Sequence, residues 1–283
     1  MITAEHLTLE VSSPAGQRRI LDDLSASISD GEFVAIMGAN GAGKTSFARC
    51  LNGLIAPTSG EIRIDSLSVK DHHHLPAIRE RVGMVFQNPD NQIVGATVER
   101  DVAFGLENLG LPRDEMRRRV ELVLDLFHLE KYRHHPPHLL SGGEKQRLAI
   151  AAVVAMQPSH LIFDEPTSLL DYPSRVELLQ LAVALNRGEN ALAPRPLTVL
   201  FITQFPEEAL FARRLLIFDR GHLKFDGHPI QIFQQVEELE SIGLRPPLEF
   251  LAWHRMLGLA SRQNPSEKFP FASIEDFILN PIL

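Results

Sequence analysis

Short apolar segments separated by turn signals run through most of the chain, with amphipathic segments between them. Runs of β-prone residues predict strands at 7–11, 21–28, 33–36, 61–64, 82–86, 161–164 and 197–203, and a hairpin at 215–218 and 222–225. Helical periodicity predicts helices at 46–51, 97–132, 141–156 and 174–187, with 114–127 the clearest amphipathic stretch. Strands that alternate with helices favour an α/β domain with a mostly parallel core sheet.

The pattern changes after residue 228. Residues 229–242 predict one helix, 244–247 break it, and 248–259 predict another. A lone short helix would expose the apolar positions Leu248, Leu251, Trp253 and Leu257. We therefore divide the chain into a domain at 1–228 and a helical region at 229–283, which we expect to serve contact between subunits. Before it, the polar, proline-containing segment 188–196 predicts a surface loop.

Composition narrows the class of protein. The 283 residues are 44% apolar and 23% charged, as in an ordinary globular protein, and no run approaches the ~18 apolar residues of a membrane-spanning helix. The first residues lack the pattern of a signal peptide, and the single Cys50 cannot form an internal disulfide, which fits a reducing cytosol. A net charge of −8 argues against a protein that coats nucleic acid, and Arg117–Arg119 are expected on a solvated helix face.

A glycine-rich loop between a predicted strand and a predicted helix is the first candidate for chemistry. Residues 38–45 read Gly-Ala-Asn-Gly-Ala-Gly-Lys-Thr, the complete P-loop pattern. Its glycines let backbone N–H groups approach phosphate oxygens, and the helix adds its positive dipole end. Lys44 is expected to reach the β- and γ-phosphates of a nucleoside triphosphate, and Thr45 to offer its hydroxyl to Mg²⁺. The residues expected to bind nucleotide here are Gly38, Ala39, Asn40, Gly41, Ala42, Gly43, Lys44, Thr45 and Ser46.

Two further segments would complement this loop. The apolar strand 161–163 ends in Asp164, which it would deliver to the Mg²⁺ shell, and in Glu165, which could polarise an attacking water. Residues 140–144, Leu-Ser-Gly-Gly-Glu, place a second phosphate-compatible loop at a helix N-terminus. This loop carries no lysine, so it is poorly suited to hold a nucleotide alone.

Together these segments resemble the nucleotide-binding subunits of ABC transporters over residues 1 to about 228. Leu140–Arg147 match that family's signature motif, Asp164 and Glu165 its Walker B motif, and Ser168–Asp171 its D-loop. Gln87 matches the Q-loop glutamine, which in the family contacts Mg²⁺ and responds to the membrane subunits. The resemblance implies an antiparallel β subdomain and a helical signature subdomain beside the core sheet. It also implies ATP and Mg²⁺ as cofactors, with Thr45, Gln87 and Asp164 around the metal.

The resemblance implies how the site is completed. In the family two subunits face head to tail, and each ATP lies between the P-loop of one and the signature loop of the other. Here Ser141, Gly142 and Gly143 would contact the nucleotide held by a second ATPase subunit, identical or related. Closure on ATP would do work on membrane partners because nucleotide binds the closed state better.

Within this family, residues 86–92 look like the ATPases of energy-coupling factor (ECF) transporters, including the cobalt and nickel types. Those ATPases carry a short helical C-terminal region used in dimer contact, and Gly243–Pro247 followed by Leu251 and Ala252 is similar to it. The resemblance implies an ATPase that drives uptake of a vitamin or a transition-metal ion. It would bind integral membrane subunits at the cytoplasmic face of the membrane.

Two positions depart from the family pattern. The switch histidine expected after the strand ending at Thr203 is Gln204, whose amide can donate a hydrogen bond but cannot become cationic or shuttle a proton. Glu165 and Gln204 are therefore the expected catalytic residues, the latter with altered chemistry. Val11 occupies the expected place of an adenine-stacking aromatic and offers no π-face, which leaves open how the base is held.

Two other functions fit the motifs. One is a non-transport ABC ATPase acting on soluble assemblies or nucleic acid, which the net charge and the Q-loop segment disfavour. The other is a slowly hydrolysing partner in a heterodimeric ATPase pair, which Gln204 suggests. The histidines at 72–74 and at 134, 135 and 138 lack carboxylate or cysteine partners at ligand spacing, so we expect solvated loops there.

Overall fold

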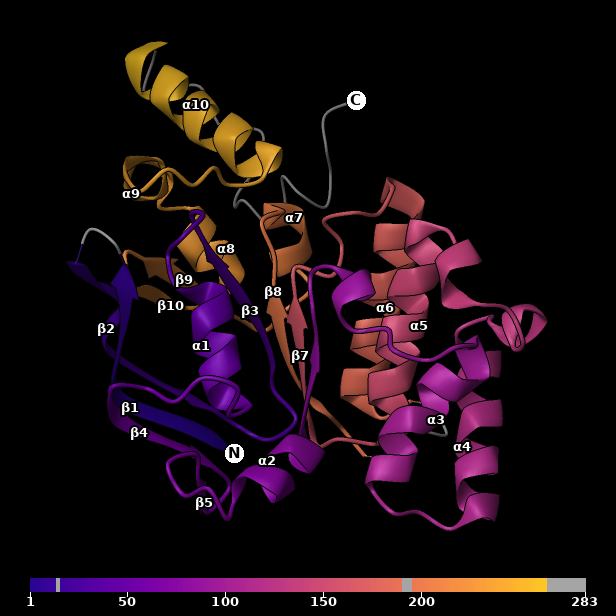
Figure 1. Cartoon of the computed structure of the whole chain (residues 1–283). Helices are drawn as coiled ribbons and strands as arrows, with labels where there is room; N and C mark the ends of the chain where they lie inside the picture. The colour runs from indigo at the N-terminus through magenta and orange to yellow at the C-terminus, as the bar shows by residue number, and fades with distance from the viewer. Residues whose placement is uncertain (14–15, 190–194, 264–283) are drawn as a thin grey trace.

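The computed structural model describes residues 1–13, 16–189 and 195–263, which form two sheets with helices between and beside them (Figure 1). The core sheet has the strand order β10-β9-β3-β8-β7-β6. Its strands are β3 (Phe33–Gly38), β6 (Val82–Val85), β7 (His160–Asp164), β8 (Thr198–Ile202), β9 (Arg214–Asp219) and β10 (His222–Gly227). Neighbouring strands run parallel except for the β9–β10 hairpin. The prediction of a mostly parallel core sheet is confirmed.

The second sheet is antiparallel and has the order β2-β1-β4-β5. It consists of β1 (Ile2–Ser13), β2 (Gly16–Ile28), β4 (Ser59–Ile64) and β5 (Leu67–Ser68). Helix α1 (Lys44–Leu51) lies between the two sheets and contacts strands of both (Figure 1). The expected antiparallel β subdomain is therefore present, and the P-loop helix joins it to the core sheet.

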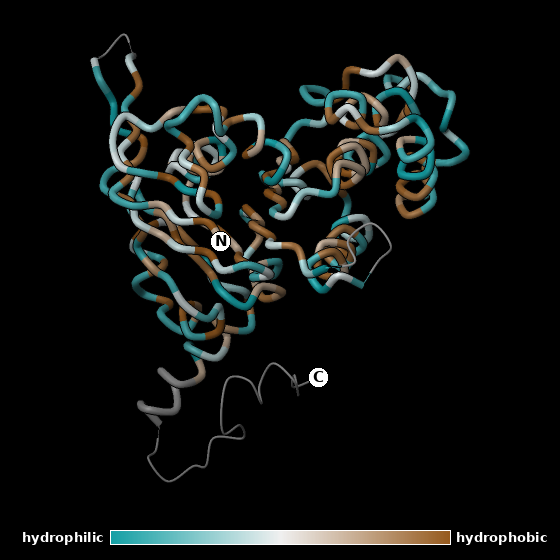
Figure 2. Tube along the Cα trace, turned by 90° about the horizontal axis from the view of Figure 1, so that it is seen from below, coloured by the Kyte–Doolittle hydropathy of each residue, from teal (hydrophilic) through white to brown (hydrophobic). Residues whose placement is uncertain are grey.

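Alternate side chains of the central strand β3 serve two apolar cores. Phe33, Ala35 and Met37 belong to the core under the helices, whereas Val34 and Ile36 belong to the core shared with α1 and the antiparallel sheet. Every residue of β3 is buried, as expected for a parallel strand covered on both faces. In Figure 2 hydrophobic residues gather along the inner segments of the trace, and hydrophilic residues follow many of the outer loops.

A group of helices covers one side of the core sheet, on the right of Figure 1. Its long helices are α3 (Val98–Asn108), α4 (Arg113–Leu126), α5 (Gly142–Ala155) and α6 (Tyr172–Arg187). The predicted helical stretch 97–132 is interrupted at Leu109–Pro112, where Gly110 adopts a positive φ of 65°. Short helices are α2 (Leu75–Arg81) and α7 (Pro206–Ala209), with 3₁₀ turns at Pro89–Asn91, Glu130–Tyr132 and Pro137–Leu139. No helix among the described residues is long and apolar enough to span a bilayer.

The prediction of a single helix over 229–242 is wrong. The segment forms α8 (Pro229–Phe233) and α9 (Val236–Ser241), because Gln235 leaves helical geometry with φ −84° and ψ 58°. The amide of Gln235 bonds to the carbonyl three residues back, which tightens and ends α8. The predicted break before the last helix is confirmed, and α10 spans Leu248–Gln263.

The C-terminal helices pack on the core. Ile232, Phe233, Leu239 and Phe250 are buried in the same cluster as the central sheet, whereas Leu248 is 75% exposed. The division into 1–228 and 229–283 therefore remains a prediction about function, not a boundary between separate cores. Residues 190–194 of the predicted surface loop, residues 264–283 and the side chain of Leu257 lie outside the described part of the chain.

We expect Phe233→Ala to lower the free energy of unfolding by about 3–5 kcal/mol, because it removes a fully buried ring that packs edge-on against Phe250 at a centroid distance of 5.5 Å. Urea unfolding monitored by circular dichroism measures the change. Glu240→Ala, at an exposed position of α9, is the control and should change stability by less than about 0.5 kcal/mol. Equal stability of the two variants would show that the C-terminal helices are not part of the cooperative fold.

Candidate functional site

The glycine-rich loop follows directly after β3, a strand that is buried on both faces and therefore fixed in position. The strand ends at Gly38, whose φ of 154° and close approach to the Phe218 carbonyl exclude a side chain, since a Cβ would lie 2.4 Å from that oxygen. At the other end of the loop, Gly43 has a φ of 106°, and a Cβ there would lie 2.8 Å from the Ile20 carbonyl. Helix α1 begins at the next residue, so the loop leads directly into a helix N-terminus.

Lys44 lies inside this loop and is only 5% exposed. Its Nζ donates to the carbonyls of Gly38 at 2.8 Å and Ala39 at 3.2 Å, and it lies 3.9 Å from a carboxylate oxygen of Glu165. Burial lowers the pKa of the Lys44 ammonium, and the carboxylates of Glu165 and Asp164 oppose that shift. The ammonium is thus held at the centre of the loop by hydrogen bonds to backbone.

Strand β7 delivers Asp164 to the same place. The Thr45 hydroxyl donates to Oδ1 of Asp164 at 2.8 Å, which joins the start of α1 to the end of β7. Burial raises the pKa of Asp164, whereas the Thr45 hydrogen bond and the charges of Arg49 and Lys44 lower it. A carboxylate and a hydroxyl side by side are oxygen donors of the kind that Mg²⁺ prefers.

Glu165 and Gln87 are also in contact. Glu165 adopts a left-handed backbone conformation with φ 50°, and its amide donates to the carbonyl of Ile202 at the end of β8. The Gln87 Nε2 donates to the Glu165 carboxylate at 3.1 Å. This contact joins the segment after β6 to the segment after β7, and it fixes the direction of the carboxylate.

Two cavities adjoin these residues. One, of about 420 Å³, is lined by Thr45, Arg49, Gln87 and Asp164 among others. The other, of about 220 Å³, is lined by Asn40–Ser46 and Glu165, and by Arg18 and Ile20 of β2. The structure therefore brings together every predicted residue of the P-loop, Walker B and Q-loop segments.

Arg18 and Ile20 were missed by sequence reasoning. They come from a strand that shows only an alternating pattern, and nothing in that pattern marks them as neighbours of the P-loop. The β1–β2 register, which pairs Val11 with Arg18, is the signal that could have found Arg18. Val11 itself is 40% exposed at this strand pair.

The signature loop lies elsewhere in the chain. Ser141 caps α5 in a capping box with Glu144, whose carboxylate accepts from the Ser141 amide and hydroxyl, both at 2.8 Å. Hydrogen bonds from Tyr132 and Ser141 lower the pKa of Glu144 to about 2. Gly143 lines a third cavity between α4, α5 and α6, and none of Ser141–Gly143 is among the residues that line the two P-loop cavities.

Gln204 follows β8 at the edge of the sheet where Asp164 and Glu165 also lie, and its side chain is exposed. It is not among the residues that line the two P-loop cavities. A buried hydrogen-bond network beside Gln204 was not predicted from the sequence. In it, Glu208 accepts from the hydroxyls of Thr203 and Thr167. Burial raises the pKa of Glu208, and both hydrogen bonds oppose the shift. This network anchors the backbone that carries Gln204.

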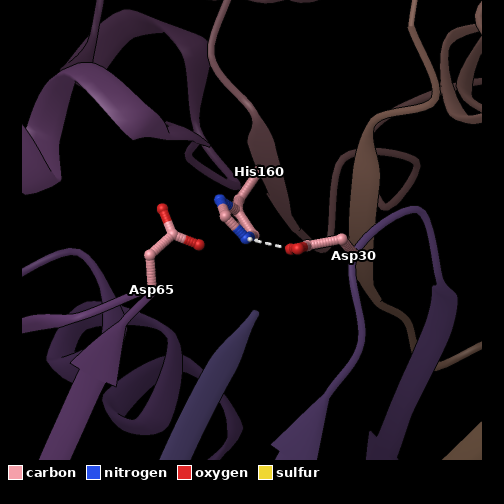
Figure 3. Close-up of side chains that lie close together, drawn as sticks. All are labelled: Asp30, Asp65 and His160. Atoms are coloured by element: carbon pink, nitrogen blue, oxygen red, sulfur yellow. Dashed lines mark ion pairs between the residues drawn. The ribbon is translucent and has the colours of Figure 1, made fainter.

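The histidines at 72–74 and at 134, 135 and 138 belong to no group of three metal-type ligands among the described residues. The one group of three metal-type ligands found there is Asp30, Asp65 and His160, shown in Figure 3. The Met1 amino group donates to both carboxylates, Arg81 donates to Asp65 at 2.8 Å, and His160 is buried 3.4 Å from Asp30. Because cations already pair with these carboxylates, we interpret the group as a junction between the two sheets.

Comparison with known protein families identifies the chain. The family model for the ABC transporter domain matches residues 21–168. The energy-coupling factor transporter ATP-binding protein EcfA1 of Caldanaerobacter subterraneus is 45% identical over 228 residues, covering 81% of this chain and 80% of the relative. The cobalt import ATP-binding protein CbiO of Syntrophus aciditrophicus is 44% identical over 248 residues, covering 87% of this chain and 86% of the relative.

Solved structures agree with these relatives. The structure of cbiO1 from Clostridium perfringens, part of the ABC transporter complex cbiONQ, superimposes with a TM-score of 0.73 at 32% identity, covering 89% of this chain and 98% of that one. A dimeric ATP-binding cassette in a post-hydrolysis state, bound to ADP and Pi, gives a TM-score of 0.73 at 29% identity and covers 81% and 99%. With the P-loop geometry above, these matches show that the chain belongs to the ABC transporter family, as an ATP-hydrolysing subunit of the energy-coupling factor type.

Proposed function

We propose that this chain binds Mg-ATP at the P-loop, hydrolyses it with Glu165, and thereby drives uptake of a vitamin or a transition-metal ion through membrane partners. The observation that carries the site assignment is the pair of hydrogen bonds from Thr45 to Asp164 and from Gln87 to Glu165. They gather residues from three distant segments around one ammonium, that of Lys44.

Each residue has a role that its contacts support. Lys44 and the N-terminus of α1 supply positive charge for the phosphates. Thr45, Asp164 and Gln87 offer the oxygen atoms that would hold Mg²⁺, which supplies neutralisation of phosphate charge when bound. Glu165 is held by Gln87 in the position of a base that orients or accepts a proton from the attacking water.

A second ATPase subunit would complete the site. Ser141–Gly143 stand at the N-terminus of α5, where backbone N–H groups and the helix dipole favour an anion, but they do not reach this chain's own P-loop cavities. A head-to-tail partner would place this loop against the opposite nucleotide. The relative whose structure was solved as a dimer with ADP and Pi supports the arrangement.

The surface formed by the residues that follow Gln87 in the sequence suits a membrane partner. Beyond the Q-loop, Val94 is 65% exposed and Phe104 is 50% exposed, and Asp101 ties the two segments by accepting from the amide of Val94 at 2.8 Å. Apolar side chains at such a surface fit contact with an integral membrane subunit at the cytoplasmic face of the membrane.

Two substitutions are expected to separate nucleotide binding from hydrolysis. Lys44→Ala should abolish tight Mg-ATP binding, because it removes the charge at the centre of the phosphate loop. Glu165→Gln should keep binding but stop turnover, because an amide cannot accept the proton of water. Equilibrium binding and phosphate release measure the two effects.

Lys70→Ala and Glu207→Gln, at exposed sites, are the matched controls and should match wild type in both assays. Hydrolysis by Glu165→Gln at the wild-type rate would contradict the role given to Glu165.

Gln204 supports a second form of this function, in which the site on this P-loop is slow and the partner is a related chain with a histidine at that position. A neutral amide donates a weaker hydrogen bond to a γ-phosphate than a charged donor, by on the order of 1 kcal/mol. Gln204→His, assayed with the partner in membranes, should raise turnover about fivefold. An unchanged or lower rate would mean that glutamine is a working variant and that unequal sites should not be inferred from it.

We expect residues 229–283 to contribute to subunit pairing and not to nucleotide binding. Removing them would also strip Phe233 and Phe250 from the core, so a surface change is the cleaner test. Leu248→Arg at the exposed start of α10 should weaken dimerisation at least about fivefold in sedimentation equilibrium and leave ATP affinity unchanged. Dimerisation equal to wild type would remove α10 from the interface.

A further inference from the structure

Arg18 lies at the mouth of the phosphate cavity. It lines the 220 Å³ cavity that also contains Lys44, Thr45 and Ser46, and its Nη2 would lie 3.8 Å from a Cβ built on Gly41. It also lines a second cavity, of about 500 Å³, together with Arg19 and Ala39–Ala42 among others. The guanidinium therefore lies beside the P-loop and borders both cavities.

The Arg18 side chain is also available for a ligand. It is exposed, and no ion pair holds it among the residues that the structure describes. The adjacent Arg19 differs, because Glu10 and Asp22 accept from its guanidinium at 2.9 and 3.0 Å. Successive residues of a strand point to opposite faces, and of the two arginines only Arg18 lines the 220 Å³ cavity that contains Lys44, whereas Arg19 lines only the 500 Å³ cavity.

The arrangement of side chains around the cavity indicates which part of a nucleotide would meet Arg18. Lys44 and Glu165 mark the end where the reacting phosphate must lie. The wall contributed by β2, with Arg18 and Ile20, is a different side of the same cavity. If the terminal phosphate of a nucleotide is at Glu165, the rest of the nucleotide is free to meet that wall, where Arg18 pairs with Val11 of β1.

The residue opposite Arg18 offers no ring. Val11 pairs with Arg18 across the two strands and is 40% exposed, so the pair presents one apolar side chain and one planar cation. A guanidinium plane stacks on the face of a nucleobase, as aromatic rings do. We propose that Arg18 is the platform on which the base of the bound nucleotide stacks, with Val11 and Ile20 as apolar neighbours.

This inference rests on the proposed function, because it assumes that the P-loop holds a nucleoside triphosphate. Its rival is that Arg18 binds a phosphate, as a guanidinium over a phosphate loop also can. The two differ in the ligand they need: stacking requires the base, whereas phosphate binding does not.

The test compares Mg-ATP with inorganic tripolyphosphate, which has the phosphates and no base, by calorimetric titration of the full-length chain. Arg18→Ala should weaken Mg-ATP binding roughly tenfold and leave tripolyphosphate binding unchanged. GTP should lose as much as ATP, because stacking uses the face of the base and not its edge. Arg19→Ala, at the neighbouring paired arginine, is the matched control and should bind like wild type.

A rescue variant provides a second readout. Val11→Tyr in the Arg18→Ala background should restore most of the lost ATP affinity, since the new ring stands at the paired position on β1. Equal loss for ATP and tripolyphosphate, or no loss for either, would overturn the stacking role. Absence of ATP binding by the wild-type chain would instead refute the proposed function itself, and Lys44→Ala, which should lose both ligands, separates that case.

Discussion

Burial of the parallel strands on both faces is the constraint on which the site depends. β3, β7 and β8 are buried at every position and the residues between their ends are apolar, so only residues at or beyond the strand ends can carry chemistry. Polar groups can therefore appear only where these strands end. The P-loop, the Asp164–Glu165 pair and the Thr203–Gln204 segment share one edge because their strands are parallel neighbours.

The charges at this edge are arranged before a ligand arrives. Burial disfavours the charged forms of both Lys44 and Asp164, and each is supported by the opposite charge of the other and by hydrogen bonds. Preorganised dipoles and charges cost little reorganisation when a phosphate enters. The orientation of the Glu165 carboxylate is also set before a ligand arrives, because Glu165 has a left-handed backbone conformation and its carboxylate accepts from Gln87.

Features encoded in short segments could be predicted from the sequence, and features set by long-range packing could not. The P-loop, the core strands and the signature helix follow from local pattern, and the structure has them within a few residues. The break between α8 and α9 could not be predicted, because Gln234 and Gln235 carry no helix-ending signal. The place of Arg18 beside the P-loop depends on strand register between β1 and β2, which periodicity does not determine.

The capping box at α5 gives the signature loop two competing uses. The single hydroxyl proton of Ser141 is donated to Glu144, so a phosphate oxygen can receive it only when that bond breaks. The cap itself, in which the Ser141 Oγ accepts from the Glu144 amide, does not use that proton and can remain. A hydrogen bond to a charged acceptor contributes about 1.5–3 kcal/mol, so a phosphate oxygen that replaces the Glu144 carboxylate as acceptor would return a comparable amount. Engagement of the loop would then exchange one charged acceptor for another at almost equal free energy. Two states of almost equal free energy interconvert readily. An ATPase needs this property because it must release its product in every cycle.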